Sequence, residues 1–292
     1  MKVLIIGGHG FIGKAIHDTL EADGHEVIST SSSVSTNYKN LLIDSNLFDT
    51  NSMVALLNFV EPDVVIQSSW ITEKKNYEQS ADNLRYSSAT VNLARLCFRK
   101  NIKHFVGIGS SAEYGVNQPN CIAGKSPTLP ETTYAQSKLR TFKLISEISK
   151  SFSTRFTWVR IFQPYGKGLG HSRLIPIIIS GLQSGSSVRI QRPNNILDWT
   201  SVEDIASAIS FLLKVDTPNV LDVGTGVGTS VLDLANSIAE ILNVDSRLIS
   251  CSANPLSDEI NSLVVGKESP LFRAGWNPED ALLPGLRRLL SK

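Results

Sequence analysis

Three glycines spaced three residues apart follow the first apolar run of this chain. Residues 3–6 read VLII, the next seven read GGHGFIG, and a helical pattern then runs to residue 22. In a strand–turn–helix unit the first glycine permits a sharp turn, the second lets the main chain approach a pyrophosphate, and the third allows close helix packing. An ordinary strand-to-helix turn is the alternative. We predict a dinucleotide site, with the helix N-terminus facing the anion, made by Gly7, Gly10, Phe11, Ile12 and Gly13.

Short apolar runs alternate with longer helical segments through the first half of the chain. Brief runs rich in β-branched residues are typical of strands buried on both faces, and the helices between them carry the chain back across the sheet. We expect strands at 3–6, 26–28, 41–43, 63–66, 104–108 and 156–160, and helices at 11–22, 51–59, 81–100 and 134–150. This alternation predicts an α/β fold with a doubly wound parallel sheet of the Rossmann type and right-handed crossovers.

Glycine and proline become frequent after Arg160, which indicates an irregular segment that leaves the sheet. A helix-like run at 202–214 and a strand-like run at 219–223 then return the chain to the first domain. We therefore predict two interleaved domains. Residues 1–165, with about 202–224, form the cofactor-binding Rossmann domain, and residues 166–201 and 225–292 form a smaller C-terminal lobe that binds substrate.

The charge and cysteine content argue against several classes of protein. Lys and Arg number 28 against 27 Asp and Glu, so the net charge of +1 does not favour a nucleic-acid surface. The three cysteines are far apart and lack metal-ligand spacing, and the histidines form no HxH or HExxH set. No apolar run approaches the roughly 20 residues that span a bilayer. We expect a soluble cytoplasmic protein with no nucleic-acid partner, no membrane contact and no metal site.

A run of serines stands where an NAD-selective site commonly has a carboxylate, about 20 residues after the glycines. Residues 29–33 read STSSS, and Glu26 comes too early to bond the adenosine ribose. Because no carboxylate would repel a 2′-phosphate and Ser31 and Ser32 could bond to it, NADP(H) is preferred, although NAD(H) is possible. A solvated surface loop is the alternative. Asp44, after the third expected strand, either accepts from the adenine amino group or is a loop carboxylate.

Hydroxyl groups and a tyrosine–lysine pair stand near the edge of the sheet where ligands bind in such folds. Residues 110–115 read SSAEYG at the end of the fifth expected strand, and residues 134–138 read YAQSK. The spacing of four places Tyr134 and Lys138 on neighbouring turns of one helix face. A lysine cation stabilises phenolate, so it would lower the pKa of the Tyr134 phenol from about 10 towards useful acid–base strength.

With these motifs the chain resembles the extended short-chain dehydrogenase/reductases, in the branch that modifies nucleotide sugars. The resemblance extends to RIFQPYG at 160–166, LDWTSVED at 197–204 and AGWNP at 274–278. It implies that Tyr134 donates or accepts the proton and that Lys138 binds the nicotinamide ribose and tunes Tyr134. It also implies that Ser110 bonds the reacting carbonyl, a task that Ser111 could share.

Departures from the family pattern narrow the reaction. Nucleotide-sugar 4,6-dehydratases of the family carry an Asp-Glu pair where this chain has Ser111 and Ala112, so a dehydratase is disfavoured. Gln163 stands where the family has asparagine, and Leu197 where it has arginine. Trp70 could shape the sugar pocket, although a tryptophan is often only packing. Basic residues of the second lobe could meet a diphosphate, and we name Arg173 and Arg192, with His171 and Arg189 as further candidates.

The resemblance implies an NADP(H)-dependent reductase that acts on the 4-keto group of a nucleotide-linked 4-keto-6-deoxyhexose. The alternative is an NAD-dependent nucleotide-sugar 4-epimerase, which uses the same three residues and retains its cofactor. A non-catalytic NADP-binding regulator is a third hypothesis, which the intact Ser110, Tyr134 and Lys138 disfavour. Family analogy also predicts a homodimer that packs through the helices at 81–100 and 134–150.

Overall fold

The computed structural model describes residues 1–30, 36–38, 41–43, 45–71, 76–251, 261–279 and 282–291. Within them the main sheet has six parallel strands in the order β13-β8-β6-β5-β1-β2. They are β1 (Lys2–Ile6), β2 (Glu26–Thr30), β5 (Val64–Gln67), β6 (His104–Ser110), β8 (Arg155–Ile161) and β13 (Val220–Val223). The doubly wound parallel sheet predicted from the sequence is confirmed.

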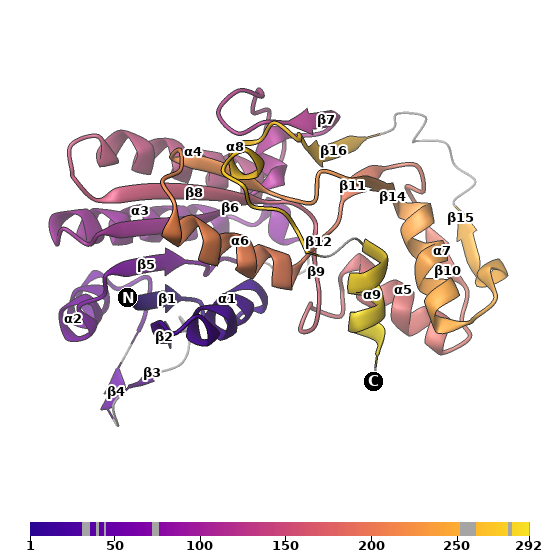
Figure 1. Ribbon diagram of the computed structural model, residues 1–292, viewed down its shortest axis with the longest axis horizontal. Helices are drawn as coiled ribbons and strands as arrows, with labels where there is room; N and C mark the ends of the chain where they lie inside the picture. Colours follow the sequence, from indigo (N-terminus) through magenta and orange to yellow (C-terminus); the bar gives the residue numbers. More distant parts are fainter. Residues whose placement is uncertain are drawn as a thin grey trace.

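Helices cover both faces of this sheet (Figure 1). Alternate residues of each strand point to opposite faces, so Leu4 and Ile6 enter one apolar core while Val3 and Ile5 enter the other. The first core is closed by α2 (Thr50–Val60), α3 (Asp82–Arg99) and α4 (Thr133–Ser149). The second is closed by α1 (Phe11–Ala22), α6 (Val202–Lys214) and α8 (Pro270–Arg273). Because both faces are covered, the strands appear in the sequence as uninterrupted apolar runs.

The expected strand at 41–43 forms but does not join the main sheet, so this part of the prediction is wrong. It is β4 (Leu41–Ile43), and it pairs antiparallel with β3 (Thr36–Tyr38). Two residues separate these strands, and so short a connection joins antiparallel neighbours, whereas parallel neighbours need a crossover of a dozen residues or more. The sixth strand of the sheet is β13, which lies beside β8 at the opposite edge from β2.

A second group of elements lies beyond the carboxyl ends of the parallel strands (Figure 1). Its helices are α5 (Leu174–Gln183), α7 (Val231–Leu242) and α9 (Leu282–Leu290), which share an apolar core that includes Ile178, Leu234 and Leu286. Short strands pair in this region: β10 (Val188–Ile190) with β15 (Ile249–Cys251), and β9 (Pro164–Tyr165) with β12 (Thr200–Ser201). The described chain also contains the helical turns η1 (Tyr77–Gln79), η2 (Ser111–Tyr114) and η3 (Ser246–Leu248).

A four-stranded sheet joins segments from both predicted domains. Its order is β14-β11-β16-β7, built from β14 (Gly228–Ser230), β11 (Ile196–Asp198), β16 (Ser262–Val265) and β7 (Gln118–Cys121). The strand β7 comes from residues 1–165, yet it pairs in parallel with β16 near the other end of the chain. Main-chain hydrogen bonds between β7 and β16 therefore connect the two predicted domains.

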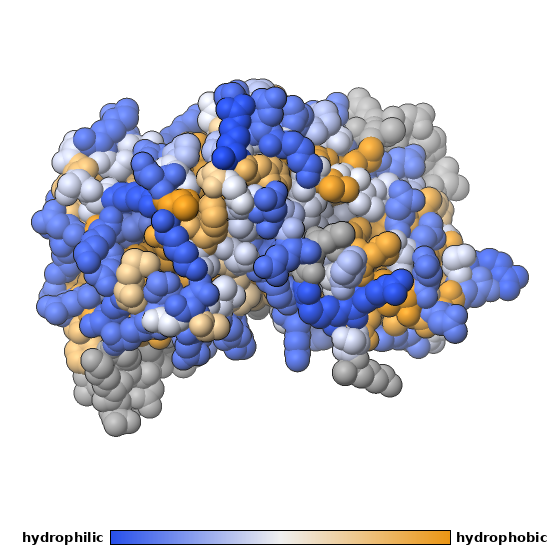
Figure 2. All heavy atoms as spheres, viewed as in Figure 1, coloured by the Kyte–Doolittle hydropathy of each residue, from blue (hydrophilic) through white to orange (hydrophobic). Residues whose placement is uncertain are grey.

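The face seen in Figure 2 is mainly hydrophilic, with apolar side chains showing over α7 and α9. Leu283, on α9, is 43% exposed. Within the ranges described above, the structure contains no helix long and apolar enough to cross a membrane.

Candidate active site

The glycine-rich turn after β1 has the backbone shape that the sequence predicts. Gly7 adopts a φ of +86°, and a Cβ on it would lie 2.6 Å from the Ser69 nitrogen. The N–H groups of Gly7 and Gly8 donate to the Thr30 carbonyl at 2.8 and 2.9 Å, which ties the turn to the end of β2. A side chain at Gly7 would therefore be strained and would collide with the main chain after β5.

Gly13 brings α1 against this turn, because a Cβ on Gly13 would lie 2.2 Å from the Gly7 carbonyl oxygen. The helix starts after Gly10 with no side-chain cap and no acidic residue in its first turn, which contains Phe11 and Ile12. A helix N-terminus has N–H groups without intrahelical partners and the positive end of the helix dipole. These residues fit a pyrophosphate, because the N-terminus of α1 has no side-chain cap and its first turn carries no carboxylate.

Three predicted cofactor contacts, Ser31, Ser32 and Asp44, lie outside the described residues. The end of β2 is described up to Thr30, whose buried hydroxyl has no hydrogen-bond partner among the described residues. The Ser29 hydroxyl is 2.8 Å from Nδ1 of His17 on α1. The preference between NADP(H) and NAD(H) therefore stays a prediction.

Ser110 and Tyr134 meet at the carboxyl end of β6. Ser110 is the last residue of β6, and Tyr134 lies in the first turn of α4, where the Thr132 hydroxyl caps the helix by accepting from the Ala135 N–H at 3.1 Å. The Ser110 side chain lies near enough to the Tyr134 phenol to act on its pKa in the lowering direction. The predicted serine and tyrosine, 24 residues apart in the chain, are thus brought together at this end of the strand.

Lys138 lies one turn further along α4, and only 3% of it is exposed. Its Nζ donates to the Ile108 carbonyl at 2.7 Å and lies 3.8 Å from the centroid of the Trp70 ring, a cation–π contact. Burial lowers the pKa of Lys138 to about 7, and the negative charge of Glu113 raises it. The structure therefore brings Lys138 and Trp70 together with Tyr134, whose ring centroid is 6.5 Å from that of Trp70.

The pKa of Tyr134 differs from the sequence-based expectation. Burial raises the pKa of its phenol, and the Ser110 side chain acts in the lowering direction. Lys138 is not among the groups that set this pKa, in contrast to the prediction, and its ammonium group contacts the Ile108 carbonyl and the Trp70 ring. In this arrangement the phenol is a protonated donor near neutral pH.

Arg173 reaches this cluster from the second group of elements. It precedes α5, and its Nη1 donates to the Tyr77 hydroxyl at 3.1 Å while its Cζ lies 4.7 Å from the Tyr77 ring centroid. The Tyr77 ring in turn packs edge-on against Tyr134 with centroids 5.3 Å apart. The sequence analysis missed Tyr77, since it stands in a stretch without helical or strand periodicity and belongs to none of the motifs.

The other predicted site residues are placed less closely to Tyr134. Ser111 is buried in η2 directly after Ser110. Gln163 is half-buried between β8 and β9, and its main-chain carbonyl accepts from the Thr200 N–H. Arg192 is exposed in the loop between β10 and β11. In the described part of the chain, no side-chain hydrogen bond or ring contact joins any of these three to Tyr134 or Lys138.

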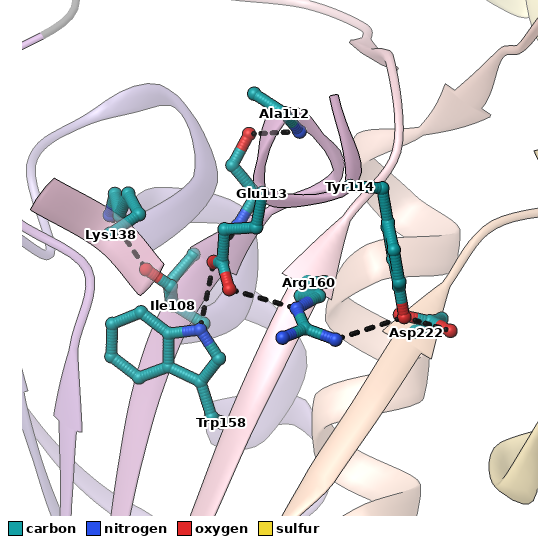
Figure 3. A network of polar contacts seen from close by, with 9 residues as sticks. Ile108, Ala112, Glu113, Tyr114, Lys138, Trp158, Arg160 and Asp222 are labelled. Atoms are coloured by element: carbon teal, nitrogen blue, oxygen red, sulfur yellow. Dashed lines mark hydrogen bonds and ion pairs between the residues drawn. The ribbon is translucent and has the colours of Figure 1, made fainter. Parts of the chain in front are cut away.

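A buried polar network lies behind Ser110 (Figure 3). Glu113 accepts from the Ser110 N–H at 3.0 Å and from Nε1 of Trp158 at 2.9 Å through Oε1, and from Nε of Arg160 at 2.8 Å through Oε2. Arg160 also donates to the Tyr114 hydroxyl, which donates to Asp222 at the end of β13. Burial raises the pKa of Asp222 to about 7. The sequence analysis gave no role to Glu113, Arg160 or Asp222.

Proteins that modify nucleotide sugars match this chain along most of its length. The UDP-glucose 4-epimerase of Lactobacillus helveticus is 24% identical over 311 residues, covering 96% of this chain and 92% of that protein. The dTDP-4-dehydro-6-deoxyglucose reductase of Escherichia coli is 22% identical over 308 residues, covering 99% and 96%. The structure of Thermus thermophilus UDP-glucose 4-epimerase in complex with NAD matches with a TM-score of 0.84 at 22% identity, covering 99% of this chain and 97% of that chain.

The structural similarity agrees with the parallel sheet and the glycine-rich turn, and a family match covers the part of the chain that contains them. Residues 3–224 match the family described as NAD dependent epimerase/dehydratase, and they include Ser110, Tyr134 and Lys138. This match confirms the resemblance to the nucleotide-sugar branch of the extended short-chain dehydrogenase/reductases, and the chain belongs to the NAD dependent epimerase/dehydratase family.

Proposed function

We propose that this protein is an NADP(H)-dependent reductase of the 4-keto group of a nucleotide-linked 4-keto-6-deoxyhexose. The observation that carries the proposal is the convergence of three residues at the carboxyl end of β6: Ser110 ends this strand, Tyr134 begins α4, and Lys138 is buried one turn further along α4 and donates to the Ile108 carbonyl. The glycine-rich turn and the uncapped N-terminus of α1 supply a cradle for the pyrophosphate of the cofactor at the same edge of the sheet.

The bound cofactor would supply the hydride in this reaction. Tyr134 would give a proton to the carbonyl oxygen, since burial keeps its phenol protonated near neutral pH. The Ser110 hydroxyl would donate to the same oxygen and stabilise the negative charge that develops on it. Lys138 would contact the nicotinamide ribose and keep the site electropositive. Ser111 is buried next to Ser110, and its hydroxyl would share the task of bonding the carbonyl oxygen.

The proposed substrate class follows from the relatives and from the residues around Tyr134. The relative from Escherichia coli is named a dTDP-4-dehydro-6-deoxyglucose reductase. Trp70 offers an aromatic face beside Tyr134, and Arg173 brings a guanidinium group to Tyr77, which itself contacts Tyr134. We assign the sugar to this side of the site, with Gln163 as a further contact, and the nucleoside diphosphate to residues 166–201 and 225–292, where Arg192 is exposed.

A nucleotide-sugar 4-epimerase is the second candidate. It is favoured by the similarity to the UDP-glucose 4-epimerases of Lactobacillus helveticus and Thermus thermophilus, the latter in complex with NAD. The two functions differ in what happens to the cofactor, because a reductase consumes NADPH in proportion to product whereas an epimerase uses NAD without net consumption. Absence of an acidic residue from positions 29–33 supports the reductase with NADP(H), and NAD(H) is the cofactor of the alternative.

The test combines a cofactor assay with removal of the Tyr134 hydroxyl. Purified protein is supplied with NADPH and with dTDP-, UDP- or GDP-linked 4-keto-6-deoxyhexoses, and NADPH oxidation is followed by absorbance. We expect stoichiometric oxidation with at least one of these sugars. Tyr134→Phe should lower kcat by roughly 10³-fold with the Kd for NADPH changed by less than about threefold.

Tyr165→Phe is the matched control, because it removes a buried phenol hydroxyl that has no hydrogen-bond partner among the described residues. It should keep the kcat of the wild type. Equal turnover in wild type and Tyr134→Phe would refute the role of Tyr134. Tightly held NAD in the purified protein, with interconversion of UDP-hexoses and no consumption of NADPH, would replace the reductase by the epimerase.

We further propose a homodimer in which α3 and α4 of two copies pack together. These two helices pack against each other within one chain, and they carry the exposed apolar side chains Leu84 (48% exposed) and Leu144 (40% exposed). Two long helices from each copy would form a four-helix interface and cover these side chains.

A further inference from the structure

Glu113 is a fully buried carboxylate one helical turn from Ser110, with 0% of its surface exposed. A buried charge is costly unless it is paired and hydrogen-bonded. Here the cost is offset by Arg160, whose Nε lies 2.8 Å from Oε2 and which is itself 3% exposed. Both oxygens of the Glu113 carboxylate are thus held by named donors in the interior of the protein (Figure 3).

The last three residues of β6 are clamped from two sides. Lys138 donates to the Ile108 carbonyl at 2.7 Å, and Glu113 accepts from the Ser110 N–H at 3.0 Å. Gly109 stands between them, and a Cβ on it would lie 2.4 Å from Nε1 of Trp158 and 2.7 Å from Oε1 of Glu113. The glycine therefore lets the indole and the carboxylate approach the main chain that presents the Ser110 hydroxyl.

The carboxylate also acts on Lys138 through its charge. Burial lowers the pKa of Lys138 to about 7, and Glu113 is the charged group that raises it. The groups that face the ammonium come from four elements or loops: Tyr134 on its own helix, Trp158 on β8, the Ile108 carbonyl on β6 and Trp70 after β5. Of these only Tyr134 is titratable, and its pKa is raised by burial, so it is neutral in the range where Lys138 titrates.

We propose that Glu113 is a positioning residue of the active site, whose carboxylate fixes the main chain at Ser110 and balances the ammonium group of Lys138. The inference rests on the proposed function, because Ser110 and Lys138 matter only if they act on a substrate and a cofactor. Glu113 is not a catalytic acid in this assignment: it is closed off from solvent, and both its oxygens are occupied by groups of the protein itself.

The first experiment reads the charge of Lys138 without any substrate. Protein labelled with ¹³C at the lysine ε-carbons is titrated by NMR, and Lys138→Met assigns the signal. We expect a midpoint near 7 in the wild type. Since a lysine is charged below its pKa, loss of the opposing carboxylate in Glu113→Gln should move the midpoint to lower pH by about one unit. Glu113→Asp should restore part of this shift.

Glu147→Gln is the matched control, because Glu147 lies on the same helix as Lys138 but is exposed and pairs with Lys150. It should leave the midpoint of Lys138 unchanged. An unchanged midpoint in Glu113→Gln would overturn the proposal. If that variant does not fold, the double variant Glu113→Gln/Arg160→Met is compared with Arg160→Met alone, so that the two differ only in the Glu113 charge; equal midpoints in these two variants overturn the proposal equally.

The second experiment measures turnover with NADPH and the 4-keto nucleotide sugar found in the assay above. Glu113→Gln should lower kcat by roughly 10²-fold, with the alkaline limb of the pH profile moved to lower pH, because a misplaced Ser110 and an uncharged Lys138 both weaken the reaction. Wild-type kcat and an unmoved limb would overturn the proposal. If even the wild type reduces no sugar, the proposed function fails, while the NMR titration still decides the link between Glu113 and Lys138.

Discussion

Single atoms decide the shape of the cofactor turn, and Gly13 is the tightest position on α1. Its hydrogen faces the Gly7 carbonyl oxygen, and a Cβ there would come within 2.9 Å of the Gly7 carbon and the Gly8 Cα as well. The atoms in the way are all main chain, so no side-chain rotation can relieve the contact. The strand, the turn and the helix would have to move apart, which would also move the N–H groups that face the pyrophosphate.

We therefore expect Gly13→Ala to weaken cofactor binding at least roughly tenfold and to lower the free energy of unfolding by about 1–3 kcal/mol, as overpacked sites do. Calorimetric titration with NADPH and NADH, together with urea unfolding, measures both effects. Gly170→Ala is the control, because a Cβ on Gly170 meets nothing within 4 Å. Cofactor affinity that is unchanged in Gly13→Ala would contradict the assignment of this turn.

At the scale of elements, the return of the chain through α6 and β13 completes the sheet. The strand β13 pairs with β8 from Val220 to Val223, and α6 packs against α1 over the same apolar core. This return places Asp222 behind Tyr114, where it accepts the hydroxyl hydrogen bond at 2.8 Å. The edge strand β13 is thus connected to Ser110 through the buried hydrogen-bond network of Glu113.

Leu221→Ala should lower the free energy of unfolding by about 3 kcal/mol, because Leu221 is 0% exposed and its removal leaves a cavity between β13 and the helices on that face. Urea unfolding followed by circular dichroism measures the loss. Val227→Ala, at a position 58% exposed, is the control and should change it by less than about 0.5 kcal/mol. Equal stability of the two variants would mean that β13 is not packed as described.

At the scale of the whole molecule, the site is assembled from both groups of elements. The main sheet and α4 supply Ser110, Tyr134 and Lys138, while Arg173 arrives from the segment before α5 and meets Tyr77. The four-stranded sheet that pairs β7 with β16 ties the two groups together by their main chains. Because α4 also carries the exposed Leu144, the proposed dimer interface and Tyr134, the proposed proton donor, share one helix.

The dimer prediction is tested by Leu144→Asp, which places a charge in the proposed interface beside a hollow lined by Pro130, Leu139 and Leu144. We expect the wild type to elute with the mass of a dimer in light-scattering chromatography and Leu144→Asp to shift towards the monomer. Ile177→Asp is the control, since Ile177 is similarly exposed (49%) but lies on α5. A monomeric wild type would contradict the prediction.

Local patterns in the sequence were enough to predict the parallel sheet, the glycine-rich turn and the placement of Tyr134 and Lys138 on one helix. The reason is that each depends on residues close in the chain: uninterrupted apolar runs fit strands covered on both faces, glycine spacing fits a strand–turn–helix unit, and a spacing of four fits one helix face. Tyr134 and Lys138 share α4 for that reason.

Long-range contacts were decided only by the tertiary structure. The strand at Leu41–Ile43 pairs with its near neighbour instead of the sheet, and Tyr77 meets Arg173 across 96 positions of sequence. The pKa values of Tyr134 and Lys138 were also decided by the tertiary structure. They depend on burial and on the charge of Glu113, and the YAQSK motif contains information on neither. The sequence by itself determined which helices and strands form, because local spacing of residues sets the backbone conformation. Only the tertiary structure decided which charged groups are buried away from water and which protein groups then form hydrogen bonds with them.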